Sequence, residues 1–182
     1  MNKDISIIGL GKLGSCMLAA YASSGHRVIG VDINDAYVKA INLGKAPVEE
    51  TDLQKYLSEN TARISATQDY SEAIQNSDIT FIIVPTPTDE TEGFSINYVL
   101  GACADIGKAL KQKNSYHLIV LTSTVLPLDC ESKIIPELEK NSNKKCGADF
   151  GFCYSPEFIA IGSVIRDLLN PDFFLIGEFD KK

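Results

Sequence analysis

The chain has 182 residues, of which 45% are hydrophobic and 23% are charged, and its formal net charge is −7. This length suffices for one α/β domain with a substantial core, while the acidic balance argues against nucleic acid or an anionic membrane as partners. No apolar run approaches the ~18 residues of a membrane span, and the N-terminus lacks a cleavable signal pattern. Five scattered cysteines show no metal-ligand spacing. We therefore expect a cytoplasmic protein with reduced thiols and no metal site.

The first predicted elements are a strand at 4–9, a helix at 12–24 and a strand at 27–32, and they enclose a G-x-G-x-x-G motif. Its first glycine allows the turn out of the strand, its second lets the backbone approach a pyrophosphate, and its third lets the helix pack close to the strand. The helix N-terminus also offers unpaired N–H groups to phosphate. A glycine-rich turn without a ligand is the alternative, but the strand–turn–helix–strand context favours a dinucleotide. We assign the whole loop to the cofactor: Gly9, Leu10, Gly11, Lys12, Leu13 and Gly14.

An acidic residue, Asp32, ends the second predicted strand, 18 residues after Gly14. A carboxylate there accepts hydrogen bonds from the adenosine ribose and repels the 2′-phosphate of NADP. Residues 33–35 contain no arginine that would offset this repulsion, so NAD is the expected cofactor. Asp32 could also cap the next helix, which is compatible with a role in NAD binding.

Strands and helices continue to alternate along the rest of the chain. We expect strands at 62–66, 79–84, 117–121, 149–154 and 173–176, and helices at 34–43, 52–58, 70–76, 95–113, 129–140 and 162–169. Several of these strands are nearly continuous apolar runs, which is typical of strands buried on both faces of a parallel sheet. The sequence therefore predicts an α/β fold, a Rossmann-like doubly wound and mainly parallel sheet with helices on both faces.

In such a sheet, ligands bind beyond the carboxyl ends of the strands. A proline-stiffened exit follows the fourth predicted strand, and its hydroxyls could contact a ribose or the nicotinamide; a plain turn is the alternative. Ser123 and Thr124 follow the fifth strand, where a serine/threonine turn or a helix cap is the alternative, and Thr124 could orient a water. We expect these segments to converge beside the glycine loop, and from the first exit we select Val84, Pro85, Thr86, Pro87 and Thr88.

A carboxylate, Glu157, follows the sixth predicted strand within the run Ser-Pro-Glu-Phe. At the mouth of the expected crevice it could act as a general base on water or on a substrate hydroxyl. The alternative is a glutamate in the first turn of a helix, where it would complement the helix dipole.

Together these segments resemble the NAD-binding N-terminal domain of the UDP-glucose/GDP-mannose dehydrogenase family, the nucleotide-sugar 6-dehydrogenases. The matching runs cover nearly the whole chain in order: GLGKLG, VDIN, INLGKAPVEE, FIIVPTPTD, TSTV and SPEFIAIGSVIRDLLNPDFFLIG. The resemblance implies a four-electron oxidation in which two NAD molecules are reduced. A sugar C6 alcohol becomes an aldehyde, then a cysteine-bound thioester, and finally a uronate.

The resemblance also implies roles for individual residues. The glycine loop and Asp32 would hold the adenosine diphosphate part of NAD, and the exits of the fourth and fifth strands would line the rest of its site. Glu157 would act as the acid/base residue, and Thr124 would help to place the hydrolytic water. A UDP- or GDP-linked hexose would contact the backbone of Glu157, Phe158, Ile159, Ala160 and Ile161.

The chain departs from the family pattern at three positions. Ile161 stands where many members have a second glutamate, Ser155 where many have asparagine, and Tyr37 where a basic residue is common. The resemblance places the nucleophilic cysteine, its assisting lysine and asparagine, a dimer-forming central helix and a nucleotide-binding C-terminal domain beyond residue 182. We expect residues 1–182 to be one NAD-binding domain of a longer homodimeric or larger enzyme, inactive alone.

The residues alone leave two other classes of protein open. One is a β-hydroxyacid dehydrogenase of the 6-phosphogluconate or 3-hydroxyisobutyrate type, which shares the superfold. The Ser-Pro-Glu-Phe run argues against it. The other is a non-enzymatic dinucleotide-sensing module, which has no use for Glu157.

Overall fold

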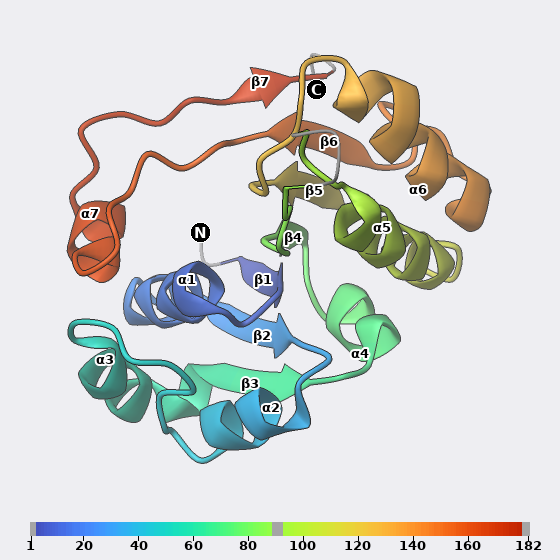
Figure 1. The fold of residues 1–182 in the computed structure, drawn as a ribbon. Helices are drawn as coiled ribbons and strands as arrows, with labels where there is room; N and C mark the ends of the chain where they lie inside the picture. Colours follow the sequence, from blue (N-terminus) through green and yellow to red (C-terminus); the bar gives the residue numbers. More distant parts are fainter. Residues whose placement is uncertain (1–2, 89–92, 180–182) are drawn as a thin grey trace.

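In the described part of the chain, one sheet of seven strands forms the centre of the fold (Figure 1). The computed structural model describes residues 3–88 and 93–179. The strands are β1 (Asp4–Ile8), β2 (Arg27–Val31), β3 (Ile64–Thr67), β4 (Ile79–Ile82), β5 (Leu118–Leu121), β6 (Gly151–Tyr154) and β7 (Gly177–Glu178). Their order is β3-β2-β1-β4-β5-β6-β7, with the first six strands parallel and β7 antiparallel to β6. The order reverses between β1 and β4, which is the position where open α/β sheets bind ligands.

Helices cover both faces of this sheet. They are α1 (Lys12–Ser23), α2 (Asp35–Asn42), α3 (Leu53–Glu59), α4 (Tyr70–Gln75), α5 (Asn97–Leu110), α6 (Ile135–Ser142) and α7 (Val164–Leu169), with a 3-10 turn at Thr61–Arg63 and a π-helical turn at Cys130–Ile134. Apolar side chains of α1, α2, α3 and α7 form one core cluster, and those of α4, α5 and α6 form another. None of the helices in the described part of the chain is both long and apolar enough to cross a membrane.

Alternating side chains of the strands supply both core clusters. In β1, Ile5 and Ile7 pack on the α1 side, whereas Ile8 packs on the α5 side. All three are at most 5% exposed, as expected for a strand in the middle of a parallel sheet. Two short helices begin at side-chain caps, because Asn34 accepts a hydrogen bond from the Ala36 amide before α2 and Asp69 accepts one from the Ser71 amide before α4.

The predicted doubly wound α/β fold is confirmed, but the last predicted strand is wrong. Residues 173–176 form no strand, and the chain pairs with β6 only at Gly177–Glu178. Phe173 instead packs on Phe158, with ring centroids 5.1 Å apart. The connections before and after α7 run side by side from the sheet to this helix (Figure 1). The apolar run therefore stays outside the sheet and contacts the other connection through Phe173.

Candidate functional site

The glycine loop forms a tight cradle between β1 and α1. Gly9 has φ +100°, and a Cβ atom there would lie 2.2 Å from the carbonyl oxygen of Ile83. A Cβ atom on Gly14 would lie 1.8 Å from the Gly9 carbonyl oxygen. A Cβ atom on Gly11 would have no heavy atom within 4 Å, so this glycine borders open space. Two of the glycines are thus required for folding, and the third leaves room for a ligand.

The first turn of α1 presents its backbone to that open space. Gly11 occupies the N-cap position, and no side chain caps the helix there. Residues 11–14 line the adjoining cleft, so the N-terminal amides and the positive end of the helix dipole are available to an anion. This arrangement suits a pyrophosphate.

Asp32 connects the glycine loop to the end of β2. Its Oδ2 accepts a 2.7 Å hydrogen bond from the Leu10 amide, and its Oδ1 accepts one of 2.8 Å from the Asn34 amide. The alternative role of Asp32 as the cap of the next helix is wrong, because Asn34 is the N-cap of α2. The half-buried carboxylate lines the cleft beside the loop.

The cleft itself has a volume of about 810 Å³. Gly9 and residues 11–14 of the glycine loop, Asp32, Val84 and Pro85 line one side of it, at positions that the sequence assigns to the cofactor. Leu10, the remaining residue of the loop, is buried in the core on the α1 side and does not line the cleft. The sequence does not predict the wall from α4 and α5. The helical spacing of apolar residues identifies which face of a helix is buried, but it does not identify what the other face borders. The lining residues on this wall are Tyr70, Asn97, Tyr98, Gly101, Ala102 and Asp105, and the other lining residues that the sequence does not predict are Ile8, Val31, Ile33, Asn34, Tyr37 and Ile83.

Tyr70, on the α4 part of this wall, has negatively charged neighbours. Burial and, after it, the nearby carboxylates of Asp105 and Asp32 together raise the pKa of its hydroxyl to about 12. Two carboxylates from different elements thus lie near one tyrosine at the β2 side of the cleft. A negative field there disfavours the binding of a further phosphate group.

Ser123 holds the exits of β4 and β5 together. Its hydroxyl donates a 2.7 Å hydrogen bond to the Val84 carbonyl and accepts one of 2.9 Å from the Val84 amide. The side chain is 7% exposed and forms neither a turn nor a helix cap. It fixes the backbone at the point where β4 enters the cleft.

The other candidates near these exits lie outside the cleft. Within the described residues, its lining includes Val84 and Pro85, but it does not include Thr86, Pro87, Thr88, Ser123 or Thr124. Thr88 bridges to Phe94, and Thr124 is exposed. The expected convergence of all post-strand segments beside the glycine loop is therefore seen only for the first residues after β4.

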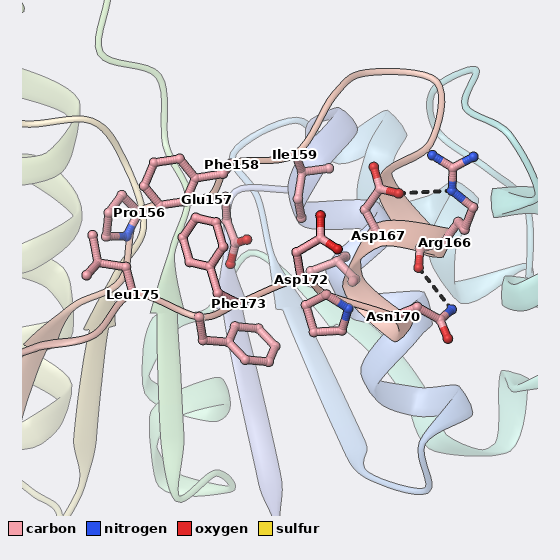
Figure 2. A pocket seen from close by; sticks show the side chains of 13 residues that line it. Pro156, Glu157, Phe158, Ile159, Arg166, Asp167, Asn170, Asp172, Phe173 and Leu175 are labelled. Atoms are coloured by element: carbon pink, nitrogen blue, oxygen red, sulfur yellow. Dashed lines mark hydrogen bonds and ion pairs between the residues drawn. The ribbon is translucent and has the colours of Figure 1, made fainter.

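Glu157 lies in a separate, smaller pocket of about 260 Å³ (Figure 2). The pocket lies between residues 156–159, helix α7 and the chain from Asn170 to Leu175. Figure 2 shows the Glu157 carboxylate pointing inward between these segments. Burial raises the pKa of Glu157. Burial and, after it, the charge of Glu157 raise the pKa of the Tyr21 phenol on α1. Glu157 precedes α7, which begins at Val164, so the alternative of a first-turn helix glutamate is wrong.

The four residues after Glu157 differ in their surroundings. Phe158 is exposed and packs on Phe173, Ile159 packs against the core on the α1 side, and Ala160 and Ile161 are exposed. The turn that follows contacts a residue distant in the sequence, because the Gly162 amide donates a 2.6 Å hydrogen bond to Oε1 of Glu50. A long-range contact therefore fixes the position of this segment.

A doubly wound parallel sheet with a glycine cradle, a helix N-terminus without a side-chain cap and a carboxylate after β2 defines a dinucleotide-binding domain of the Rossmann type. The residues present fit NAD, since Gly11 leaves the open approach that a pyrophosphate needs. Residues 3–182 match the model of the UDP-glucose/GDP-mannose dehydrogenase family, NAD binding domain. The chain belongs to this family, as its sequence predicts.

Two relatives and a solved structure illustrate the match. The GDP-mannose 6-dehydrogenase of Pseudomonas syringae pv. tomato is 40% identical over 179 residues, which are 97% of this chain and 41% of that protein. The UDP-glucose 6-dehydrogenase AglM of Haloferax volcanii is 34% identical over 175 residues, which are 96% of this chain and 40% of that protein.

A crystal structure of a ternary complex of GDP-mannose dehydrogenase from Pseudomonas aeruginosa matches with a TM-score of 0.94 and 38% identity, over 97% of this chain and 41% of that one. The chain thus spans about 41% of the length of these relatives. A β-hydroxyacid dehydrogenase and a sensor module are no longer favoured.

Proposed function

We propose that this chain binds NAD in the large cleft and supplies the cofactor-binding part of a nucleotide-sugar 6-dehydrogenase. That enzyme would oxidise the C6 alcohol of a UDP- or GDP-linked hexose to the uronic acid and reduce two NAD. The observation that carries the proposal is the glycine cradle joined to Asp32 by the 2.7 Å hydrogen bond from the Leu10 amide. NAD, when bound, accepts hydride.

The proposed contacts to NAD follow the order of the elements around the cleft. The amides of the glycine loop and of the first turn of α1 hold the pyrophosphate, and Asp32 accepts hydrogen bonds from the ribose. Val84 and Pro85 border the nicotinamide half, with their backbone fixed by Ser123. Beyond the cleft lining, this side of the site would be extended by Thr86, Pro87, Thr88 and Thr124.

Glu157 is proposed as the acid/base residue for the sugar. Its burial and raised pKa suit a carboxyl group that exchanges a proton during the reaction. It follows β6, so it lies beyond the same edge of the sheet as the cleft. Residues 158–161 would contact the nucleotide sugar, and Thr124 would help to place the hydrolytic water.

The substrate and the assembly are proposed from the relatives. Similar proteins include GDP-mannose and UDP-glucose 6-dehydrogenases, so the substrate class is a nucleotide-linked hexose. Residues 1–182 would act as one NAD-binding domain. The nucleophilic cysteine and the dimer interface would lie in the part of the relatives that this chain does not span.

Calorimetry with purified residues 1–182 tests the cofactor assignment. We expect NAD to bind, NADP to bind more weakly, and neither GDP-mannose nor UDP-glucose to be turned over when NADH absorbance is followed. Absence of both binding heat and a thermal shift at millimolar NAD would contradict the assignment. NADH formation by the isolated chain would contradict the proposed division of labour.

A further inference from the structure

Residues 97–105 of α5 contribute a wall of the cleft that the glycine loop does not explain. Tyr98, Gly101 and Asp105 line this wall. Near the other end of the helix, the Gln75 side chain of α4 donates a 2.8 Å hydrogen bond to the Ala109 carbonyl. Because α4 has 6 residues and α5 has 14, and their C-terminal ends lie together, the first turns of α5 extend beyond the start of α4. These turns therefore stand beside the open edge of the sheet.

Gly101 is an unfavourable residue for the interior of a helix, by about 0.5–1 kcal/mol relative to alanine. Neither packing nor backbone conformation explains it. The residue is exposed, its backbone is helical, and a Cβ atom there would have no heavy atom within 4 Å. Gly107 of the same helix is different, because a Cβ atom there would lie 2.7 Å from Cβ of Asn141. A side chain at position 101 would occupy only the space of the cleft.

Two exposed apolar side chains border the same part of the cleft. Ile33 is 81% exposed and Tyr98 is 57% exposed. Ile33 directly follows Asp32, so a ribose held by Asp32 would place its base next to Ile33. A flat base between this loop and α5 would cover both side chains and approach the helix backbone at Gly101.

We propose that Gly101 is a specificity-determining residue of the cofactor site, which keeps open the space for the adenine ring between Ile33 and α5. This inference rests on the proposed binding of NAD. It assigns the base to α5, the ribose to Asp32 and the pyrophosphate to the glycine loop. A side chain at position 101 would exclude the base and leave the nicotinamide half of the site unchanged.

Two substitutions test the inference, Gly101→Ala and Gly101→Leu. Thermal unfolding is measured without ligand, and binding of NAD, AMP and nicotinamide mononucleotide is measured by calorimetry or NMR. We expect Gly101→Ala to raise the Tm because alanine favours the helix, and to weaken NAD and AMP binding at the same time. Gly101→Leu should weaken NAD and AMP by about tenfold or more and leave the mononucleotide unaffected.

The matched control is Ala104→Gly, which lies in the same helix but outside the cleft lining. It should lower the Tm by the helix-propensity difference and leave NAD and AMP binding unchanged. Gly101 variants whose Tm is equal to or higher than that of the wild type, and which bind NAD and AMP with wild-type affinity, would overturn the inference. If the leucine variant does not fold, the alanine variant alone decides, by the opposite signs of its two effects. Failure of the wild-type chain to bind NAD would instead overturn the proposed function.

Discussion

The backbone amide of Leu10 lies 2.7 Å from Oδ2 of Asp32, so the end of β2 holds the glycine loop in place. The other carboxylate oxygen accepts the Asn34 amide at 2.8 Å. Each oxygen of an ionised carboxylate can accept a further hydrogen bond. Asp32 can therefore shape the loop and accept ribose hydroxyls with the same two atoms.

Substitution Asp32→Asn is expected to reduce the preference for NAD over NADP. Asparagine retains the size and one acceptor, but it loses the charge that repels a 2′-phosphate and half of the acceptor capacity. We expect the ratio of NAD to NADP affinity to fall about tenfold or more, which corresponds to about 1.4 kcal/mol. Calorimetry with both cofactors measures this ratio. Asp35→Asn, which removes an exposed carboxylate paired with Lys39, is the control; an unchanged ratio in Asp32→Asn would remove Asp32 from the ribose role.

Two substitutions in the glycine loop should change different properties of the protein, one its stability and the other its affinity for NAD. Gly14→Ala places a Cβ atom 1.8 Å from the Gly9 carbonyl oxygen, so we expect a large drop in Tm or failure to fold. Gly11→Ala meets no heavy atom within 4 Å, so the Tm should stay near that of the wild type while NAD binding weakens. Thermal unfolding and NAD titration of both variants measure the two effects. Wild-type NAD affinity in Gly11→Ala would show that no ligand group approaches this position.

The sequence predicts the sheet and the glycine cradle well because both depend on local patterns. Apolar runs such as 79–82 and 118–121 define buried strands, and the three glycines report steric needs that belong to the loop itself. Residues 173–176 are equally apolar, yet they form no strand and stay at least 50% exposed, with Phe173 packed on Phe158. Only the tertiary structure decides between these two outcomes.

The α5 wall of the cleft could not be predicted for a related reason. The helical period identifies Val99, Cys103 and Ile106 as the buried face of α5, and they are buried. What the opposite face borders depends on how far α5 extends past α4, which is a property of the assembled fold. The position of Glu157 in a pocket of its own likewise follows from the path of residues 170–175 beside it.

Glu157→Gln is expected to stabilise the protein at neutral pH. Burial raises the pKa of Glu157, so its carboxylate disfavours folding at any pH above that raised value. The neutral amide removes this cost. The Tm difference between variant and wild type should be largest near pH 7–8, shrink as the pH falls through the raised pKa, and vanish below about 4.5, the ordinary value for glutamate. A variant less stable than the wild type at pH 8 would indicate a favourable partner for the carboxylate.

A buried polar network lies among the sheet residues away from the cleft. His117 is fully buried, its Nε2 lies 2.7 Å from the Thr80 hydroxyl and its Nδ1 lies 3.1 Å from the Ser77 carbonyl. Because a carbonyl only accepts, Nδ1 carries the proton and Nε2 accepts from Thr80. Ser6 continues the network through a 2.6 Å contact between its hydroxyl and that of Thr80.

His117 is expected to make the protein sensitive to mild acid. Burial, followed by the nearby Lys113 charge, lowers the pKa of His117 from 6.5 to about 4. The unfolded chain therefore binds the proton more tightly, and stability is lost as the pH falls from about 6.5 to about 4, by about 3 kcal/mol in total. Urea unfolding of the wild type and His117→Gln across this range measures the difference. The variant should be less stable at pH 7.5, where it disturbs the network, but its stability should change less with pH. Parallel curves for the two proteins would exclude His117 as the source of the acid sensitivity.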